Sequence, residues 1–102
     1  MINVDKEGFL RDLNSWSEDV AKSLASQDDI ELSSSHWQIL NLVRTYYDDY
    51  QISPQMRVLV KLVREEFGPE QGSSIYLMRL FGGKPAKTIS KIAGLPKPSN
   101  CD

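Results

Sequence analysis

The chain has 102 residues, of which 40% are hydrophobic and 25% are charged, and its formal net charge is −2 at pH 7. This length suffices for one hydrophobic core and is too short for two, so we expect a single domain. No apolar run reaches the length of a membrane-spanning helix, and the first residues lack the basic and apolar blocks of a signal peptide. These features predict a cytoplasmic protein that does not enter a membrane.

The single cysteine, Cys101, is the second-to-last residue. One cysteine excludes an internal disulfide framework and a cysteine-rich zinc site, and we expect neither a metal ion nor another cofactor. The two prolines of segment 94–100 disfavour a helix, so the thiol is expected outside the core. Exposed cysteines are often retained for their reactivity, but chain ends also tolerate change. Position alone therefore leaves a reactive thiol and an incidental thiol as alternatives.

The beginning of the chain predicts a small β-hairpin followed by a short helix. Apolar residues on both sides of the polar segment 5–8 indicate two antiparallel strands joined by a four-residue turn. Ser15 and Glu18 have the spacing of a capping box, which predicts the start of the first helix. The apolar side of this helix comprises Trp16, Val20 and Leu24.

Two longer helices are predicted next. After the serines at 33–35, apolar residues recur every three or four positions as far as Tyr50. Ser53 and Pro54 have the character of an N-cap and a first helical residue, and the third helix that they begin should end at Gly68. Apolar side chains surround much of this third helix, which predicts that it is the central helix of the bundle.

Two shorter helices complete the pattern. One covers residues 75–81, and the other begins at Pro85 and ends before Gly94. His36 lies in the first turn of the second helix without another histidine or a cysteine nearby. A capping or solvent-facing role is therefore favoured over a role as metal ligand or general base.

The expected fold class is mainly α with a small β component. We predict a compact bundle of about five helices with an N-terminal antiparallel β-hairpin and a flexible C-terminal arm. The helical domain should comprise residues 1–94, and the mobile arm that bears the cysteine should comprise residues 95–102.

Positive charge gathers toward the C-terminus. Residues 1–78 contain thirteen acidic and seven basic side chains, whereas the next five charged residues are all basic. These five are Arg79, Lys84, Lys87, Lys91 and Lys97. Cations near Cys101 favour its thiolate, and the carboxylates at Asp102 oppose them. A solvated basic surface without a partner is the alternative interpretation.

The ending Lys-Ile-Ala-Gly-Leu-Pro-Lys-Pro at residues 91–98, followed by the second-to-last cysteine, resembles the DsrC/TusE sulfur-carrier family. The resemblance covers nearly the whole chain, and it also includes Trp16, Ser17, Glu18, Trp37, Ser53, Pro54, Gly72, Arg79, Leu80 and Phe81. Family members that work with dissimilatory sulfite reductase have a second cysteine eleven positions before the last one. This chain has Ser90 there, so it is similar to the single-cysteine branch, TusE.

The resemblance implies a sulfurtransferase whose catalytic residue, Cys101, carries sulfur as a persulfide. It implies an upstream TusBCD complex as donor and a downstream tRNA 2-thiouridylase, which modifies wobble uridines, as acceptor. We expect the free carrier to be monomeric and not to contact tRNA directly. The arm residues expected to dock on partners are Gly94, Leu95, Pro96, Lys97 and Pro98. The candidate basic supports are Arg57, Lys61, Arg79, Lys84, Lys87 and Lys91.

Other functions stay open at this point. The chain is either such a carrier, a carrier for another sulfur pathway, or a non-catalytic, regulatory member of the family. Asp102 favours the regulatory alternative, because relatives usually end in an aliphatic residue. A helical nucleic-acid-binding domain is suggested only by the basic region. The overall negative charge and the lack of aromatic residues among the basic ones argue against it.

Overall fold

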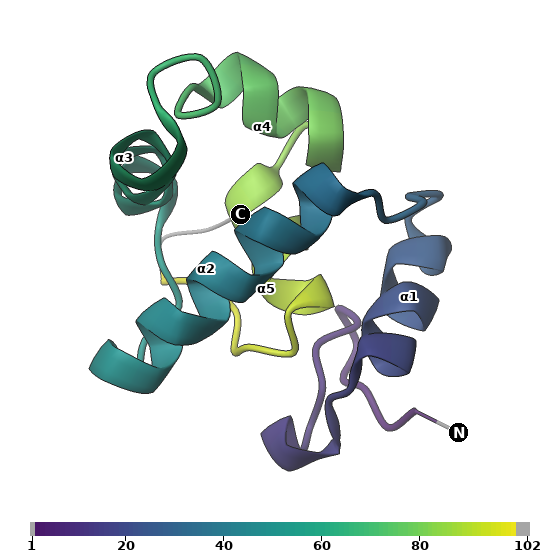
Figure 1. Ribbon diagram of the computed structural model, residues 1–102. Helices are drawn as coiled ribbons and strands as arrows, with labels where there is room; N and C mark the ends of the chain where they lie inside the picture. Colours follow the sequence, from purple (N-terminus) through teal and green to yellow (C-terminus); the bar gives the residue numbers. More distant parts are fainter. Residues whose placement is uncertain (1, 100–102) are drawn as a thin grey trace.

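The computed structural model describes residues 2–99, and Cys101 and Asp102 lie outside the described residues (Figure 1). The described chain contains the 3₁₀-helix η1 (Leu13–Ser15) and the α-helices α1 (Glu18–Gln27), α2 (Ser34–Tyr50), α3 (Met56–Phe67), α4 (Ser74–Phe81) and α5 (Pro85–Ile92). The five helices predicted from the sequence are confirmed. In this part of the chain, no helix has the length and apolar character needed to cross a membrane.

The predicted N-terminal β-hairpin is wrong, because residues 2–99 contain no strand or sheet, and the fold is therefore all-helical. Val4 and Leu10 form one isolated antiparallel bridge. The turn between them is held by Asp5, whose carboxylate accepts hydrogen bonds from the backbone N–H groups of Glu7 and Phe9. Phe9 and Leu10 are both buried, at 3% and 6% exposure, and Leu10 belongs to the central core. The pairing does not extend into strands, because the turn occupies the residues between Val4 and Leu10 and Asp12 caps η1 directly afterwards.

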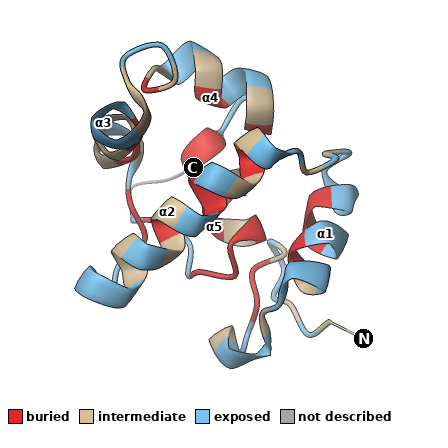
Figure 2. Cartoon of the chain, in the orientation of Figure 1, coloured by how far each residue is buried: buried red, intermediate tan, exposed pale blue. Residues whose placement is uncertain are grey.

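The central helix is α5, and the prediction that α3 is central is wrong. Helix α5 contacts each of the other four α-helices, whereas α3 packs mainly on α2 and α5. Figure 2 shows buried residues along α5, and the fully buried ones include Ile89, Ser90 and Ile92. Only Leu59 and Val63 are buried in α3. The broad apolar surface of α3 is therefore half-exposed, and the segment that leads to the arm starts from the middle of the core.

Two predicted helix starts are displaced by a few residues. Ser17, rather than Ser15, is the N-cap of α1, and its hydroxyl accepts a hydrogen bond from the backbone at 3.2 Å. Helix α3 begins at Met56 rather than at Pro54. Ser53 does not cap α3, because its side chain makes a contact with the C-terminal segment instead. In both cases the hydroxyl of the predicted cap, Ser15 or Ser53, donates to another carbonyl oxygen, that of Asp12 or of Pro96.

His36 joins the beginning of α2 to the end of α4. Its Nδ1 accepts a hydrogen bond from the backbone N–H of Ser33 at 3.0 Å, which completes a capping box. Its Nε2 lies 2.8 Å from the carbonyl oxygen of Leu80. A carbonyl can only accept, so Nε2 is the donor in this hydrogen bond. The ring also packs edge-on against Phe81. The predicted capping role of His36 is confirmed.

Candidate functional site

The site comprises the last residue of α5 and the segment that follows it, and we divide its described residues into two parts. Residues 92–95 form the arm root, and residues 96–99 form the distal arm. Figure 1 shows this yellow segment leaving α5 behind α2 and running toward the connection between α2 and α3. The contacts of the two parts differ in kind, and they are described in turn.

The arm root begins with a Schellman motif that ends α5. The backbone N–H of Leu95 donates to the carbonyl oxygen of Ser90 at 2.9 Å, and that of Gly94 donates to Lys91 at 3.1 Å. Gly94 has a φ of 75°, in the left-handed region that this motif requires and that glycine adopts without a penalty. Leu95 is 3% exposed. The chain therefore turns sharply at Gly94 and is anchored in the core directly afterwards.

Two side chains bind the last carbonyl groups of the helix. Trp16 Nε1 donates to the carbonyl oxygen of Ile92 at 2.9 Å, and Arg44 Nη1 donates to that of Ala93 at 2.6 Å. The guanidinium of Arg44 also lies over the Trp16 ring, 3.7 Å from its centroid, in a cation–π arrangement. We call this pair of residues the Trp16–Arg44 clamp. Partial burial lowers the pKa of Arg44, and nearby Asp48 opposes that shift, so the guanidinium stays charged.

The clamp also requires that residue 94 has no side chain. A Cβ atom added to Gly94 would overlap the side chain of Trp16, including Cδ1 of its ring. The glycine is therefore needed for its backbone conformation and for the close approach of the indole. Tryptophan, arginine and glycine together fix where the chain leaves α5.

The distal arm is held by side chains near the α2–α3 connection. The hydroxyl of Ser53 donates to the carbonyl oxygen of Pro96, and Gln55 Nε2 donates to the hydroxyl of Ser99 at 2.9 Å. Pro98 is buried, whereas Lys97 and Ser99 are exposed. These contacts place the last described residue, two positions before Cys101, beside the start of α3. Whether the segment 95–102 moves as an arm stays a prediction.

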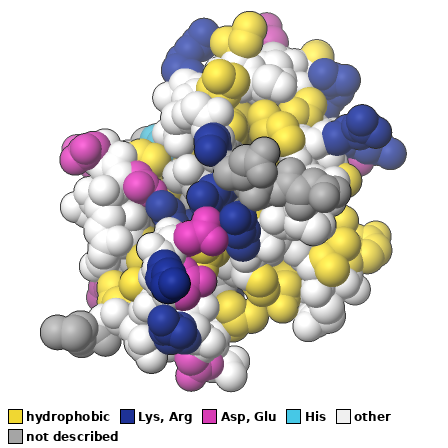
Figure 3. All heavy atoms as spheres, turned by 180° about the vertical axis from the view of Figure 1, so that it is seen from behind, with side chains coloured by type: hydrophobic (Ala, Val, Ile, Leu, Met, Phe, Trp, Pro, Cys, Tyr) yellow, Lys and Arg dark blue, Asp and Glu magenta, His cyan; other side chains and the backbone are white. Residues whose placement is uncertain are grey.

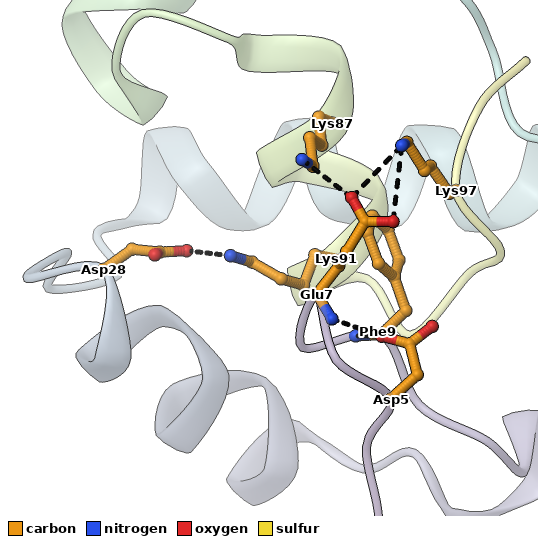
Figure 4. Close-up of polar contacts among 7 residues, drawn as sticks. All are labelled: Asp5, Glu7, Phe9, Asp28, Lys87, Lys91 and Lys97. Atoms are coloured by element: carbon orange, nitrogen blue, oxygen red, sulfur yellow. Dashed lines mark hydrogen bonds and ion pairs between the residues drawn. The ribbon is translucent and has the colours of Figure 1, made fainter. Parts of the chain in front are cut away.

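Figure 4 shows that Glu7 joins the distal arm to α5. Its Oε2 lies 2.9 Å from Lys87 Nζ and 3.1 Å from Lys97 Nζ. Hydrogen bonds from Lys87 and then from Lys97 lower the pKa of Glu7 below its ordinary value. Lys91, on the same helix as Lys87, pairs with Asp28 at 2.7 Å. Three of the predicted basic residues are therefore engaged in ion pairs within the molecule.

The other predicted basic supports are Arg57, Lys61, Arg79 and Lys84, and all four are exposed. Within residues 2–99, none of these four forms an ion pair. They come from α3, from α4 and from the residue before α5, so they do not form one cluster on one element. Figure 3 shows Lys and Arg side chains spread over this face of the molecule with Asp and Glu between them. A role for these residues in partner binding stays a prediction.

Ser90 stands at the position where the family resemblance implies a second cysteine in other members. Its side chain is fully buried, and its hydroxyl is a buried polar atom without a hydrogen-bond partner among the described residues. The backbone carbonyl of the same residue accepts the hydrogen bond from Leu95. Residue 90 therefore lies directly beneath the arm root.

The chain matches the family model described as DsrC like protein over residues 1–101, and it belongs to this family. It is 47% identical over 100 residues to the sulfurtransferase TusE of Salmonella typhimurium, covering 98% of this chain and 92% of that protein. It is 43% identical over 100 residues to the sulfurtransferase TusE homolog of Haemophilus influenzae, with the same coverage.

Solved structures give the same result. The NMR structure of Allochromatium vinosum DsrC superposes with a TM-score of 0.89 at 48% identity, covering 99% of this chain and 90% of that one. The oxidized γ-subunit of the dissimilatory sulfite reductase (DsrC) from Archaeoglobus fulgidus has a TM-score of 0.86 at 39% identity, covering 99% and 92%. The predicted family, the sulfur-carrier function and the sulfurtransferase class are confirmed.

Sequence reasoning missed several residues that hold the arm, namely Glu7, Trp16, Arg44, Ser53 and Gln55. Trp16 and Ser53 were among the residues that carry the family resemblance, which was a signal without an assigned role. Arg44 lies within the amphipathic pattern of α2 and looks like any solvent-facing arginine in the sequence. Its partner, Ala93, is 49 positions away. Local patterns do not report contacts of this separation.

Proposed function

We propose that Cys101 is the sulfur-carrying residue of this sulfurtransferase and that segment 95–102 is the arm that delivers it to partner proteins. The observation that carries the proposal is the single thiol of the chain, which stands at the end of a Gly-Leu-Pro-Lys-Pro-x-x-Cys segment in a member of the DsrC-like family. A sulfur carrier without a cofactor needs a nucleophilic sulfur atom, and this chain has one cysteine to supply it.

The reaction consists of two thiol–persulfide exchanges. The Cys101 thiolate attacks the outer sulfur of a donor persulfide, so that a new S–S bond forms and the donor's own S–S bond breaks. The donor leaves as a thiolate, and Cys101 becomes a persulfide. An acceptor thiolate then attacks the outer sulfur of this persulfide, and the Cys101 thiolate leaves. Sulfur is transferred in both steps without net oxidation or reduction.

The partners follow from the branch of the family that the chain resembles. A TusBCD-like complex acts as the donor in the cytoplasm, and a tRNA 2-thiouridylase acts as the acceptor. The support is the 47% identity to proteins named sulfurtransferase TusE, together with the serine at position 90. That serine cannot form a disulfide with Cys101, so the arm keeps one function, which is transfer.

Mass spectrometry tests this proposal directly. The protein is incubated with a cysteine desulfurase, its substrate and the upstream relay proteins, and then analysed without reductant. The wild type should gain the mass of one sulfur atom on Cys101, and Cys101→Ser should neither gain it nor support thiolation of tRNA. In Cys101→Ser/Ser99→Cys, which moves the thiol by two residues, loading should be much slower. Undiminished tRNA thiolation with Cys101→Ser would overturn the proposal.

A carrier for another sulfur pathway is the second candidate. The observation in its favour is the 48% identity to Allochromatium vinosum DsrC, which is close to the 47% identity to a TusE protein. Persulfidated protein can be offered to a tRNA 2-thiouridylase and, separately, to other sulfur-accepting enzymes. Transfer to the thiouridylase favours the first candidate, whereas transfer only to another enzyme would replace it by the second.

A further inference from the structure

We infer that Trp16 and Arg44 are positioning residues for sulfur transfer, because their clamp holds the arm root in place while the distal arm leaves its contacts to enter a partner. The inference deepens the proposed function and rests on it. It assigns a task to two side chains that belong neither to the arm nor to the basic candidates.

The clamp does more than the end of a helix requires. The Schellman motif already provides hydrogen-bond donors for two carbonyl groups of α5. At an exposed helix end, water can satisfy the remaining carbonyl groups. Here the next two carbonyl groups receive side-chain donors from residues 76 and 49 positions away in the sequence. Trp16 comes from the segment before α1, and Arg44 comes from α2. Three separate parts of the molecule therefore meet at the point where the arm begins.

The distal arm has a part-buried hydrogen bond from Ser53 to Pro96 and a buried Pro98, but its contacts at Lys97 and Ser99 are of a weaker kind. Lys97 and Glu7 form an exposed ion pair, with side-chain exposures of 37% and 42%, and such pairs are screened by salt. The hydrogen bond between Gln55 and Ser99 is also exposed. The root, in contrast, has a charge-assisted hydrogen bond, a stacked guanidinium and a buried leucine. When a partner draws the arm away, the distal contacts open first and the root remains.

A fixed root makes docking of the thiol more probable. The thiol is tethered to the domain, and its effective concentration at the partner's site falls as the flexible tether lengthens. With the root held, the flexible part begins at Pro96 once the contacts of the distal arm, including that between Ser53 and Pro96, have opened. If the clamp is lost, residues 92–95 join the flexible part and its direction is no longer set. The expected defect lies in productive encounter with the partner and not in the exchange of sulfur once the thiol is bound.

The kinetic test uses persulfidated carrier as the substrate of a purified acceptor. Arg44→Met keeps the aliphatic bulk but removes the guanidinium, and we expect a KM for the carrier about tenfold higher, the equivalent of one hydrogen bond to a charged group. The kcat should change less than about twofold, because chemistry in the docked state is unaltered. Arg44→Lys keeps the charge without the planar stacking group and should restore the KM only in part.

The matched control is Arg64→Met. Arg64 also donates to a backbone carbonyl group, that of Gly72, at 3.0 and 3.2 Å, but it lies at the connection between α3 and α4. Its loss should affect the fold in a comparable way and leave the KM unchanged. All variants are compared at a temperature where circular dichroism shows them folded. If Arg44→Met does not fold, Trp16→Phe takes its place, since phenylalanine keeps a ring and removes only the Nε1 donor.

A second measurement separates this inference from the proposed function. A nitroxide attached to the thiol of Cys101 reports the motion of the arm by electron paramagnetic resonance, without any sulfur transfer. Arg44→Met and Trp16→Phe should increase the mobility of the label, and Arg64→Met should not. If the wild type transfers no sulfur but the label responds in this way, the proposed function fails and the clamp stands. Equal label mobility and equal KM in the Arg44 and Arg64 variants would overturn the inference.

Discussion

The two parts of the C-terminal segment have different surroundings although they are neighbours in the sequence. The arm root is buried and is held through its backbone carbonyl groups by Trp16 and Arg44. The distal arm is held at Lys97 and Ser99 by exposed side chains. From this comparison we expect that the carrier combines a fixed point of attachment with a releasable end. Gly94 ends the helix through its backbone conformation, and the change from root to distal arm falls between the buried Leu95 and the exposed Pro96.

The largest expected effect is a loss of stability from Gly94→Ala in the arm root. An alanine here adopts a left-handed conformation and also overlaps the Trp16 side chain, so unfolding by urea should show a loss of about 3–4 kcal/mol. Gly82→Ala is the matched control. Gly82 has a φ of 91°, but an added Cβ meets no atom within 4 Å, so the loss should be only about 1–2 kcal/mol. Equal losses in the two variants would contradict close packing at the root.

Substitution of Ser90, which lies beneath the arm root, should raise the stability of the protein. Ser90→Ala removes a fully buried hydroxyl group that has no hydrogen-bond partner among the described residues. Relieving this uncompensated desolvation should stabilise the protein by about 1 kcal/mol. Thermal unfolding of Ser90→Ala, with Ser99→Ala as a control in the distal arm, checks the sign. A clear destabilisation by Ser90→Ala would show that the hydroxyl is bonded.

For Gln55→Ala we expect greater mobility of the distal arm with little change in the stability of the protein. Gln55→Ala removes the donor to Ser99 and should lower the free energy of unfolding by less than about 0.5 kcal/mol, because the contact is exposed. A label on Cys101 should nevertheless become more mobile. Gln51→Ala, which replaces another exposed glutamine near the end of α2, is the control and should leave the label unchanged. A large loss of stability in Gln55→Ala would make the distal arm part of the core.

The smallest expected effect is a pH dependence at Glu7. Lys87, and to a smaller extent Lys97, lower the pKa of its carboxyl group below the ordinary 4.5. The ion pairs of Glu7 with these lysines are therefore fully formed above pH 4.5. They are lost as the pH falls through the lowered pKa of the folded state. The mobility of a label on Cys101 should therefore rise in acid below pH 4.5 in the wild type. In Glu7→Gln it should be raised already at neutral pH and should change little with acid.

The sequence predicted the features of the fold that depend on local patterns. Apolar residues at helical spacing identified the five helices, and Gly94 correctly marked the end of the last one. The hairpin failed because a turn occupies the residues between Val4 and Leu10 and the chain enters η1 directly afterwards, so the pairing stays at a single bridge. The central place of α5 was missed as well. A helix of eight residues offers too few apolar positions to show that it is contacted on every side.

The sequence predicted the C-terminal segment of the candidate site, but it did not predict the residues that hold this segment in place. The tail motif predicts the arm and Cys101 as its functional residue, and both stay predictions. The partners of the arm root lie far away in the sequence, and a tryptophan before a helix or an arginine on its surface has no local signature of such a contact. Lys91 and Lys97 were predicted to support or dock the arm, with a solvated basic surface as the alternative, and the structure pairs them with Asp28 and Glu7. Composition counts charges and does not show which of them are neutralised by neighbours.

Amide hydrogen exchange by NMR tests the division of the arm most directly. The amide protons of Gly94 and Leu95 donate to backbone carbonyl groups, so they should exchange slowly in the wild type. The amides of Lys97 and Ser99, which form no backbone hydrogen bond within residues 2–99, should exchange at rates close to those of an unfolded peptide. In Arg44→Met the protection of Leu95 should fall, while that of the α3 amides stays the same. Fast exchange at Leu95 in the wild type, or equal protection along residues 94–99, would contradict a fixed root with a releasable distal arm.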